Sequence, residues 1–425
     1  MIIDYVMNHS AAQNPLFLNS KSATSNAYRD WYVWSATKPT GWSIYGNDPW
    51  YYGGTGYYFA GFWDQMPEFN LRNADALAYH QNNLRYWLNR GADGFRFDAV
   101  GNLVENGANA WEGQPDDYTI MSNVRGLLDG YAQRYMVCEG PVNPIGFSVA
   151  CCSAFAFGHD YDIVNAAKGS SSAIQAVASY FSSAAPGMAT MVSNHDSFAG
   201  DRLYDQVGGD LAQYQLAAAT YLLQPGTPFI YYGEEIGMAG GMGLSGDWKL
   251  RTPMSWTNST SDAGFTTGTP FRALSSNVAS YNVAAEQSDS TSLLGFYKAL
   301  IAGAQGPAVT RAGRLRRSAG HGQRDEFPAR ARQRALARAD QLRDERGHAE
   351  PREPAGQGRL HAGLPDLGQR HRRGRQRTSE HAGAGADGAR LRLPELSPPV
   401  RCARSERSAR ISSPCVARNR RRPTC

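Results

Sequence analysis

Several features are missing from this chain of 425 residues, and each absence narrows what the protein can be. No run of about 18 apolar residues is present, so the sequence predicts no membrane-spanning helix. Residues 1–4 lack the charged region and apolar stretch of a secretory signal peptide and resemble the start of a strand. No Gly-rich loop follows any expected strand, which argues against a site for nucleotide phosphates.

The six cysteines lack the spacing of a metal site or of a disulfide framework. Their pattern therefore predicts neither a metal site nor a set of disulfides. We interpret the adjacent pair Cys151 and Cys152 as structural rather than redox-active. The full set is Cys138, Cys151, Cys152, Cys402, Cys415 and Cys425.

Lysine is absent from residue 311 onward, where 28 arginines accompany 12 acidic residues. Residues 1–310 hold 15 basic and 26 acidic residues, so the formal net charge of +5 describes neither part. From about residue 306 the chain also has no Trp, Tyr or Met. One interpretation is a disordered basic arm that binds nucleic acid. We favour a shifted reading frame near residues 303–312, because Arg, Ala, Gly and Pro all have GC-rich codons. We expect residues 306–425 to be disordered, without a compact apolar core.

Strands and helices alternate through residues 1–305. Residues 2–7 (IIDYVM) are a short apolar run that ends in polar residues, as a buried parallel strand does. Alternation with helices predicts a parallel sheet covered by helices, and functional-looking residues at the strand ends favour a barrel over an open doubly wound sheet. The other expected elements are strands at 94–100, 135–139, 188–193 and 228–232, and helices at 74–90, 117–134, 171–182, 209–224 and 291–303.

Residues 11–70 interrupt this alternation. Between Trp31 and Trp63 lie 13 aromatic residues in 33, interleaved with Gly and Pro. Such a composition favours a folded excursion over a flexible linker. We expect most of these rings to pack the excursion itself and only one or two to stack on a ligand.

Acidic residues follow three of the expected strands. Arg96 and Asp98 point the same way, because side chains alternate along a strand. A guanidinium beside a carboxylate keeps the carboxylate ionised, as a nucleophile requires, although a structural ion pair is an equal alternative. Glu139 ends the next strand, where an isolated Glu is usually a solvated loop residue. Asn194-His195-Asp196 ends a later strand, and Asp196 capping a helix is the alternative there.

The combination is more specific than its parts. Retaining glycoside hydrolysis needs one carboxylate that attacks the anomeric carbon and one acid that protonates the leaving oxygen, about 5–5.5 Å apart. DYVMNH (4–9), GFRFDAV (94–100), MVCEGP (136–141) and MVSNHD (191–196) resemble, in order, the four signature regions of the α-amylase family, glycoside hydrolase family 13. YYGEEIGM (231–238) and RTPMSW (251–256) also resemble segments near the family's eighth strand.

The resemblance implies roles for these residues. Asp98 is the expected nucleophile, Glu139 the general acid/base and Asp196 the transition-state stabiliser. His9, Arg96 and His195 are expected to line the subsite for the attacked sugar, and Asp4 is expected to be mainly structural. Asn8 matches a position that ligates calcium in many α-amylases, so a calcium site there and a plain hydrogen-bonding role are both open. No organic cofactor is implied.

The implied fold is a (β/α)8 TIM barrel that lacks its first two strands, with a small domain inserted after the third. Residues 1–10 and 71–305 are expected to form barrel strands three to eight, and residues 11–70 the inserted domain B. Opening a barrel exposes unpaired strand edges and apolar surface. We therefore expect the chain as written to be inactive and poorly soluble.

The fifth family region helps with specificity. MPEFN (66–70) lies between the forms typical of oligo-1,6-glucosidases and of neopullulanases, which predicts α-1,4 cleavage of starch-type glucans and maltooligosaccharides. An α-glucan transglycosylase or an oligo-1,6-glucosidase on the same fold are alternatives, and a non-catalytic carbohydrate-binding homologue is a third. We expect a monomer that binds neither nucleic acid nor membrane, derived from an exported parent.

Overall fold

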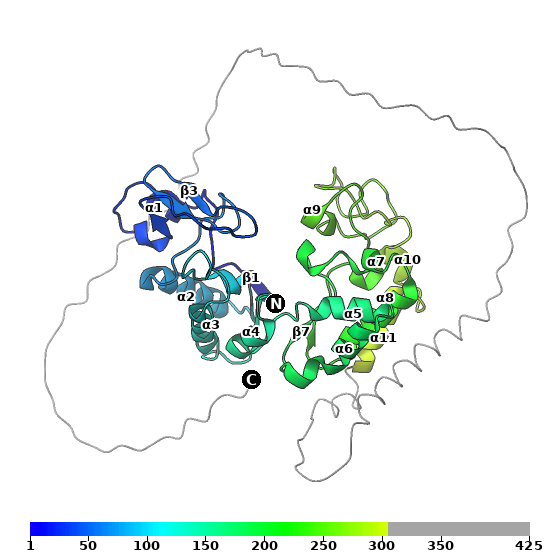
Figure 1. Ribbon diagram of the computed structural model, residues 1–425. Coiled ribbons are helices and arrows are strands. Elements are labelled where there is room, and N and C mark those ends of the chain that lie inside the picture. The colour runs from blue at the N-terminus through cyan, green and yellow to red at the C-terminus, as the bar shows by residue number, and fades with distance from the viewer. Residues whose placement is uncertain (305–425) are drawn as a thin grey trace, which may run out of the picture. The chain divides into compact units, whose positions relative to one another are not determined.

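The computed structural model describes residues 1–304, and Figure 1 shows their strands and helices. The expected alternation of strands and helices is confirmed, with strands shorter than expected at 188–193 and 228–232. The strands are β1 (Ile2–Tyr5), β2 (Trp34–Ser35), β3 (Trp50–Tyr52), β4 (Tyr57–Phe59), β5 (Gly94–Phe97), β6 (Tyr135–Cys138), β7 (Ala189–Thr190) and β8 (Thr227–Pro228). The helices are α1 (Pro15–Ser20), α2 (Ala74–Asn89), α3 (Pro115–Leu128), α4 (Pro144–Cys151), α5 (His159–Ala167), α6 (Ser171–Ser183), α7 (Leu203–Gln206), α8 (Leu211–Leu223), α9 (Gly246–Leu250), α10 (Val283–Glu286) and α11 (Leu293–Ala304).

The sheet that positions the candidate site is parallel. β5 pairs on one side with β1 and on the other with β6. Gly94 begins β5 close to the backbone of β6. A side chain cannot be placed there, because a Cβ would lie 1.9 Å from the Tyr135 carbonyl oxygen. Since the three strands run the same way, the residues that follow them lie at one edge of the sheet.

A segment that the sequence analysis missed continues this sheet. Residues 153–156 connect β6 to β7 through parallel bridges from Cys138 to Ala154 and from Phe155 to Ala189. β7 then pairs with β8 in parallel. The segment is Ser-Ala-Phe-Ala, too short and too poor in β-branched residues to be recognised as a strand. Within residues 1–304 the ladder therefore runs from β1 to β8, and no hydrogen bond joins these two strands.

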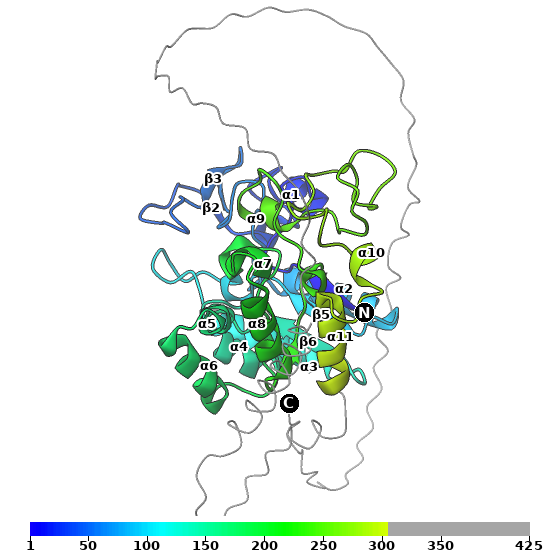
Figure 2. The same cartoon turned by 90° about the vertical axis from the view of Figure 1, so that its right-hand side faces the viewer.

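Helices cover the sheet with their apolar faces. The α2 helix begins at its cap Asn73, whose side chain accepts hydrogen bonds from the backbone of Asp75 and Ala76. One side of α2 is buried at Ala76, His80, Leu84 and Leu88, the spacing of a core-facing helix. Helices α5, α6, α8 and α11 pack beside one another in both views (Figures 1 and 2) around a core that includes Ile163, Tyr214, Tyr221 and Tyr297.

Residues 11–70 contain a small antiparallel sheet in the order β2-β4-β3. Its rings mostly pack against each other: Phe17 stacks on Trp34, and Trp50 and Phe59 share a small apolar cluster with Ile44. Tyr45, Tyr52 and Trp63 are exceptions, each with more than half of its surface exposed. The bounds that we assign to this inserted domain remain a prediction.

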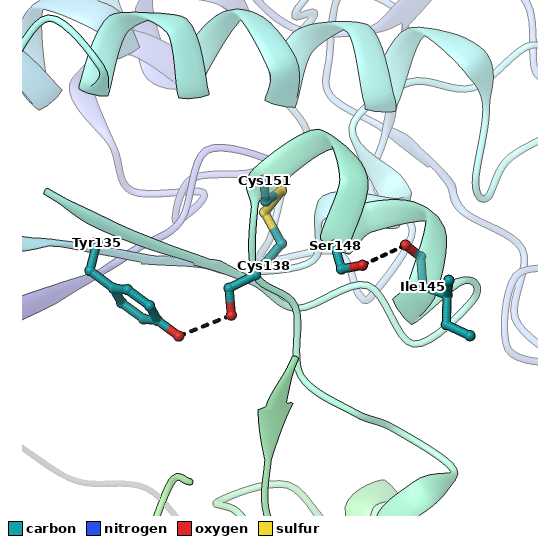
Figure 3. Close-up of a disulfide and its surroundings, with 6 residues drawn as sticks. Tyr135, Cys138, Ile145, Ser148 and Cys151 are labelled. Atoms are coloured by element: carbon teal, nitrogen blue, oxygen red, sulfur yellow. Dashed lines mark hydrogen bonds between the residues drawn. A yellow bond between two sulfur atoms is a disulfide. The ribbon is translucent and has the colours of Figure 1, made fainter. Parts of the chain in front are cut away.

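A disulfide joins Cys138 at the end of β6 to Cys151 at the end of α4, as Figure 3 shows. The cysteine spacing gave no basis for this bond. The tertiary structure creates it, because α4 turns back over the end of β6 and brings the two Cα atoms to 6.3 Å across a separation of 13 residues. Both side chains are fully buried.

None of the helices in residues 1–304 is long and apolar enough to cross a bilayer. The predicted disorder and shifted frame of residues 306–425 concern a part of the chain that lies outside the described residues.

Candidate active site

Arg96 organises the first group of acidic residues. The residue lies on β5 and is 8% exposed. Its Nη1 donates to Asp98 Oδ1 at 2.6 Å and to Asp4 Oδ1 at 2.8 Å, and its Nη2 forms an ion pair with Glu139. The contact between Arg96 and Asp98 confirms that the two side chains share one face of the strand. One guanidinium therefore holds the two carboxylates that the sequence assigned to nucleophile and acid/base.

The backbone around Asp98 turns sharply out of the strand. The Asp98 amide donates to the Tyr5 carbonyl oxygen at 3.2 Å, the last bond of the ladder between β1 and β5. Ala99 then adopts a left-handed conformation with φ of 47°. This conformation is unfavourable for a residue with a Cβ, and such residues cluster at functional sites.

Backbone hydrogen bonds hold Glu139 against β5 and the residues that follow it. Its amide donates to the Phe97 carbonyl at 2.9 Å, and its carbonyl accepts from the Val100 amide at 3.0 Å. The residue is only 7% exposed, which makes the solvated-loop interpretation wrong. The tight contact between Gly140 and the Phe147 ring then brings α4 against the residue that follows Glu139.

His9 and Asn8 follow β1 beside this group. Burial lowers the pKa of His9, and the negative charge of Asp98 opposes that effect, so His9 lies close enough to sense the proposed nucleophile. The Phe62 ring packs edge-on against the imidazole, with centroids 5.5 Å apart. Asn8 is 1% exposed, and its Oδ1 has no hydrogen-bond partner within the described residues.

Asp196 lies in a second group, beyond β7. Its Oδ2 is 3.1 Å from Nε2 of His195, and its Oδ1 accepts a hydrogen bond from Arg251 Nη2. Arg251 also donates from Nε to the His195 carbonyl at 2.8 Å and from Nη2 to Asp247 Oδ2 at 2.9 Å. Asp196 precedes a short 3-10 turn, but its side chain makes no capping bond, so the capping interpretation is wrong.

The structure thus brings together Asp98, Glu139, Arg96 and Asp4, and separately Asp196 and His195. No hydrogen bond or ion pair joins the two groups within residues 1–304. Convergence of all three acidic residues at one mouth of the barrel remains a prediction.

Two residues of the second group were missed from the sequence. Arg251 opens the RTPMSW segment, which the sequence analysis matched to the family without giving any of its residues a role. Asp247 lies four residues earlier on α9, and its Oδ1 accepts from both the amide and the hydroxyl of Ser197, at 2.9 and 2.8 Å. The available signal was a basic residue placed one helical turn after an acidic one.

Buried carboxyl groups lie next to Asn8. Burial raises the pKa of Glu68, which is 2% exposed, and hydrogen bonds connect its carboxyl to Glu105 and Asn8. Amide and carboxylate oxygens are the donors that Ca²⁺ accepts. The unpartnered Oδ1 of Asn8, whose side chain contacts the Glu68 carboxyl, therefore suits a hard cation in its chemistry. No group of three or more His, Cys, Asp or Glu side chains within residues 1–304 has the arrangement of a metal site.

The family model of the α-amylase catalytic domain matches residues 1–311. Alpha-amylase 3 of Dictyoglomus thermophilum is 29% identical over 267 residues, which cover 61% of this chain and 50% of that protein. The probable oligo-1,6-glucosidase 3 of Bacillus subtilis is 27% identical and covers 71% of this chain and 67% of its own length. The chain therefore spans about half to two thirds of the length of these relatives.

A solved α-amylase from H. orenii is 28% identical, with a TM-score of 0.59 over 71% of this chain and 62% of that chain. The match to the catalytic-domain model covers well over half of the chain and includes Asp98, Glu139 and Asp196. The chain accordingly belongs to the α-amylase catalytic domain family, glycoside hydrolase family 13.

Proposed function

We propose that this protein is a glycosidase that cleaves α-1,4-glucosidic bonds in starch-type glucans and maltooligosaccharides with retention of configuration. The observation that carries the proposal is the single buried guanidinium of Arg96 in contact with both Asp98 and Glu139. Carboxyl groups held by one guanidinium are near neighbours, as the short separation of retaining enzymes requires. The MPEFN segment (66–70) supports the α-1,4 preference.

In the first half of the reaction an Asp98 oxygen forms a bond to the anomeric carbon while the bond to the leaving oxygen breaks. Glu139 gives its proton to that oxygen, so the departing sugar leaves with a hydroxyl group. In the second half Glu139 takes a proton from water, whose oxygen attacks the same carbon and releases Asp98. The cycle consumes one water molecule and restores both carboxyl groups.

The remaining site residues would act on the sugar or on the charges. Arg96 donates to Asp98 at 2.6 Å and so holds its carboxylate in position for attack. Asp196, which Arg251 holds in place, would stabilise the positive charge that develops on the sugar ring. His9 and His195 would donate hydrogen bonds to the sugar in the cleaved subsite.

Covalent trapping tests the roles with a single turnover. In a protein with a complete barrel, a 5-fluoro-α-glucosyl fluoride should add one fluoroglucosyl group, and peptide mass spectrometry should find it on Asp98. Asp98→Asn should abolish labelling. Asp75→Asn, an exposed acidic residue in the first turn of α2, is the matched control and should label normally. A label on another residue would refute the assignment.

Two alternatives share this chemistry. A transglycosylase passes the glucosyl group to another sugar, and an oligo-1,6-glucosidase cleaves branch linkages. Incubation with maltoheptaose and with isomaltotriose, followed by product chromatography, separates them. Shorter maltooligosaccharides support α-1,4 hydrolysis, longer ones indicate transfer, and glucose from isomaltotriose alone indicates α-1,6 cleavage.

We propose Asn8 as a calcium ligand, supported by its buried, unpartnered Oδ1 and the Glu68 carboxyl beside it. Thermal unfolding in Ca²⁺ and in EDTA tests this without reference to activity. Ca²⁺ should raise the Tm of the parent chain and leave that of Asn8→Leu unchanged, because that variant lacks the oxygen ligand. An equal response of both proteins would exclude Asn8.

We also propose a monomeric, exported parent protein. The Cys138–Cys151 disulfide supports export, because such bonds persist in oxidising compartments. Cell fractionation and thiol labelling of the native host protein test the compartment, and light scattering tests the monomer. Free thiols at both positions in the purified host protein would contradict export.

A further inference from the structure

Large aromatic side chains are exposed on the loops that follow β8. Trp248, on α9, has 61% of its surface exposed and Phe271 has 66%. The guanidinium of Arg272 lies between them, with its Cζ 3.9 Å from the Trp248 ring centroid and 5.4 Å from that of Phe271. Phe265, 44% exposed, extends the row, with its centroid 6.0 Å from that of Phe271. We call Trp248, Arg272, Phe271 and Phe265 the aromatic strip.

The aromatic strip is tied to the second acidic group by hydrogen bonds. Asp247, the neighbour of Trp248 on α9, accepts hydrogen bonds from Arg251, and Arg251 in turn donates to Asp196. Arg272 donates from Nη1 to the Arg251 carbonyl at 3.0 Å. The strip is therefore positioned by the residues that hold the proposed stabiliser, and it is continuous with the candidate site.

The composition of the strip favours a sugar over other ligands. A pyranose ring has an apolar C–H face that packs on an aromatic ring and hydroxyl groups that accept hydrogen bonds from a guanidinium. The stacked arginine fixes the orientation of the Trp248 ring and supplies donors within the row. Exposed aromatic side chains that gather beside a site mark a binding surface.

We propose that the aromatic strip binds glucose units of a long α-glucan outside the cleavage point and gives the enzyme a preference for longer chains. This inference rests on the proposed function. It assigns Trp248 as the main stacking residue and Phe271 as a weaker one, because Trp248 is held by Arg272 at the shorter distance.

Calorimetric binding in the Asp98→Asn background tests the inference without hydrolysis. Trp248→Ala should weaken the binding of maltoheptaose about tenfold and Phe271→Ala about threefold, the scale of one lost stacking contact. Maltose, which is too short to reach from the cleaved subsite along the strip, should lose less than twofold. Trp87→Ala removes another exposed Trp, 42% exposed on α2, and should change neither ligand.

The outcomes separate this inference from the proposed function. If maltoheptaose binds Trp248→Ala as tightly as it binds the protein with Trp248, the proposed role of the aromatic strip is wrong. The proposed function is unaffected by that result. Equal losses for maltose and maltoheptaose also overturn the strip, because they would mean that Trp248 acts through α9 on Asp196. No saturable binding of maltoheptaose to the Asp98→Asn chain would overturn both.

Discussion

Asp98 and Glu139 differ from Asp196 in how the chain holds them. Asp98 and Glu139 directly follow strands that pair in register, and their backbone amides complete the ladders to Tyr5 and Phe97. Asp196 lies beyond the two-residue strand β7, and its carboxylate is held by Arg251, a residue 55 positions later in the chain.

Exposure differs in the same way. The Arg96 side chain that serves the first group is 10% exposed, whereas the Arg251 side chain that serves the second is 41% exposed. A buried guanidinium contributes to folding as well as to catalysis, since losing it leaves carboxylates unpaired in a dry environment. A half-exposed guanidinium is screened by solvent and contributes little to stability. The first group is therefore built into the sheet, and the second is assembled on loops.

Loss of either carboxylate in the first group should have the largest effect. In a protein with a complete barrel, Asp98→Asn and Glu139→Gln should each lower kcat on maltoheptaose by at least about a thousandfold, because the two groups act as a unit. The comparison is with the parent chain, with circular dichroism as the check on folding. Either variant working within tenfold of the parent would show that the role lies elsewhere.

The next largest effects are expected at Arg96 and Arg251, which should affect kcat and Tm differently. Arg96→Lys loses the fork that holds three carboxylates and should lower kcat about a hundredfold and lower Tm. Arg251→Lys should lower kcat about tenfold and leave Tm nearly unchanged. Steady-state kinetics and thermal unfolding of both variants check this. Equal Tm losses would remove the distinction between a sheet-built and a loop-built group.

Glu234, buried near the second group in the sequence but not bonded to it, should give the protein a pH dependence of stability. It is buried, accepts hydrogen bonds from Tyr221 and Tyr297 at 2.6 and 2.8 Å, and accepts one from Ser193 at 3.2 Å. Burial raises its pKa from 4.5 to about 7. The folded state then binds more protons than the unfolded state between these values, so stability falls as pH rises from about 4.5 to about 7 and levels off above.

Replacing Glu234 by Gln removes the titrating group and should reduce this fall by about 1–3 kcal/mol. Urea unfolding of both proteins from pH 5 to 8 measures the difference. Asp262→Asn changes a half-buried acidic residue whose pKa is lowered by a hydrogen bond from the Gly264 amide, and it is the control, expected to retain the parent profile. Parallel pH profiles of parent and Glu234→Gln would contradict the raised pKa.

The smallest effect is expected at the turn after Asp98. Ala99→Gly relieves a left-handed backbone at the cost of a more flexible unfolded chain, for a net gain of about 0.5 kcal/mol. Ala76→Gly, inside α2, should instead destabilise by about 1 kcal/mol. Differential scanning calorimetry compares the two. Destabilisation by both to the same extent would argue that Ala99 carries no strain.

The sequence predicted most of the first group and part of the second. Period-two alternation placed Arg96 and Asp98 on one face, and the ion pair between them agrees with it. The strand at residues 153–156 escaped detection because its small residues carry no β signal. Arg251 and Asp247 escaped because their value depends on a loop returning to Asp196, which local spacing does not encode.

The sequence by itself determined the alternation of strands and helices, the acidic residues at strand ends and the family to which they belong, because apolar periodicity and short motifs are local properties of the chain. The tertiary structure decided which charges meet. Only the folded chain brings Glu139 to Arg96 across two strands, joins Cys138 to Cys151 and carries Arg251 to Asp196. These contacts arise from the register of the sheet and the return of distant loops. Local propensity does not distinguish these pairings from others, and the packing of the whole fold selects among them.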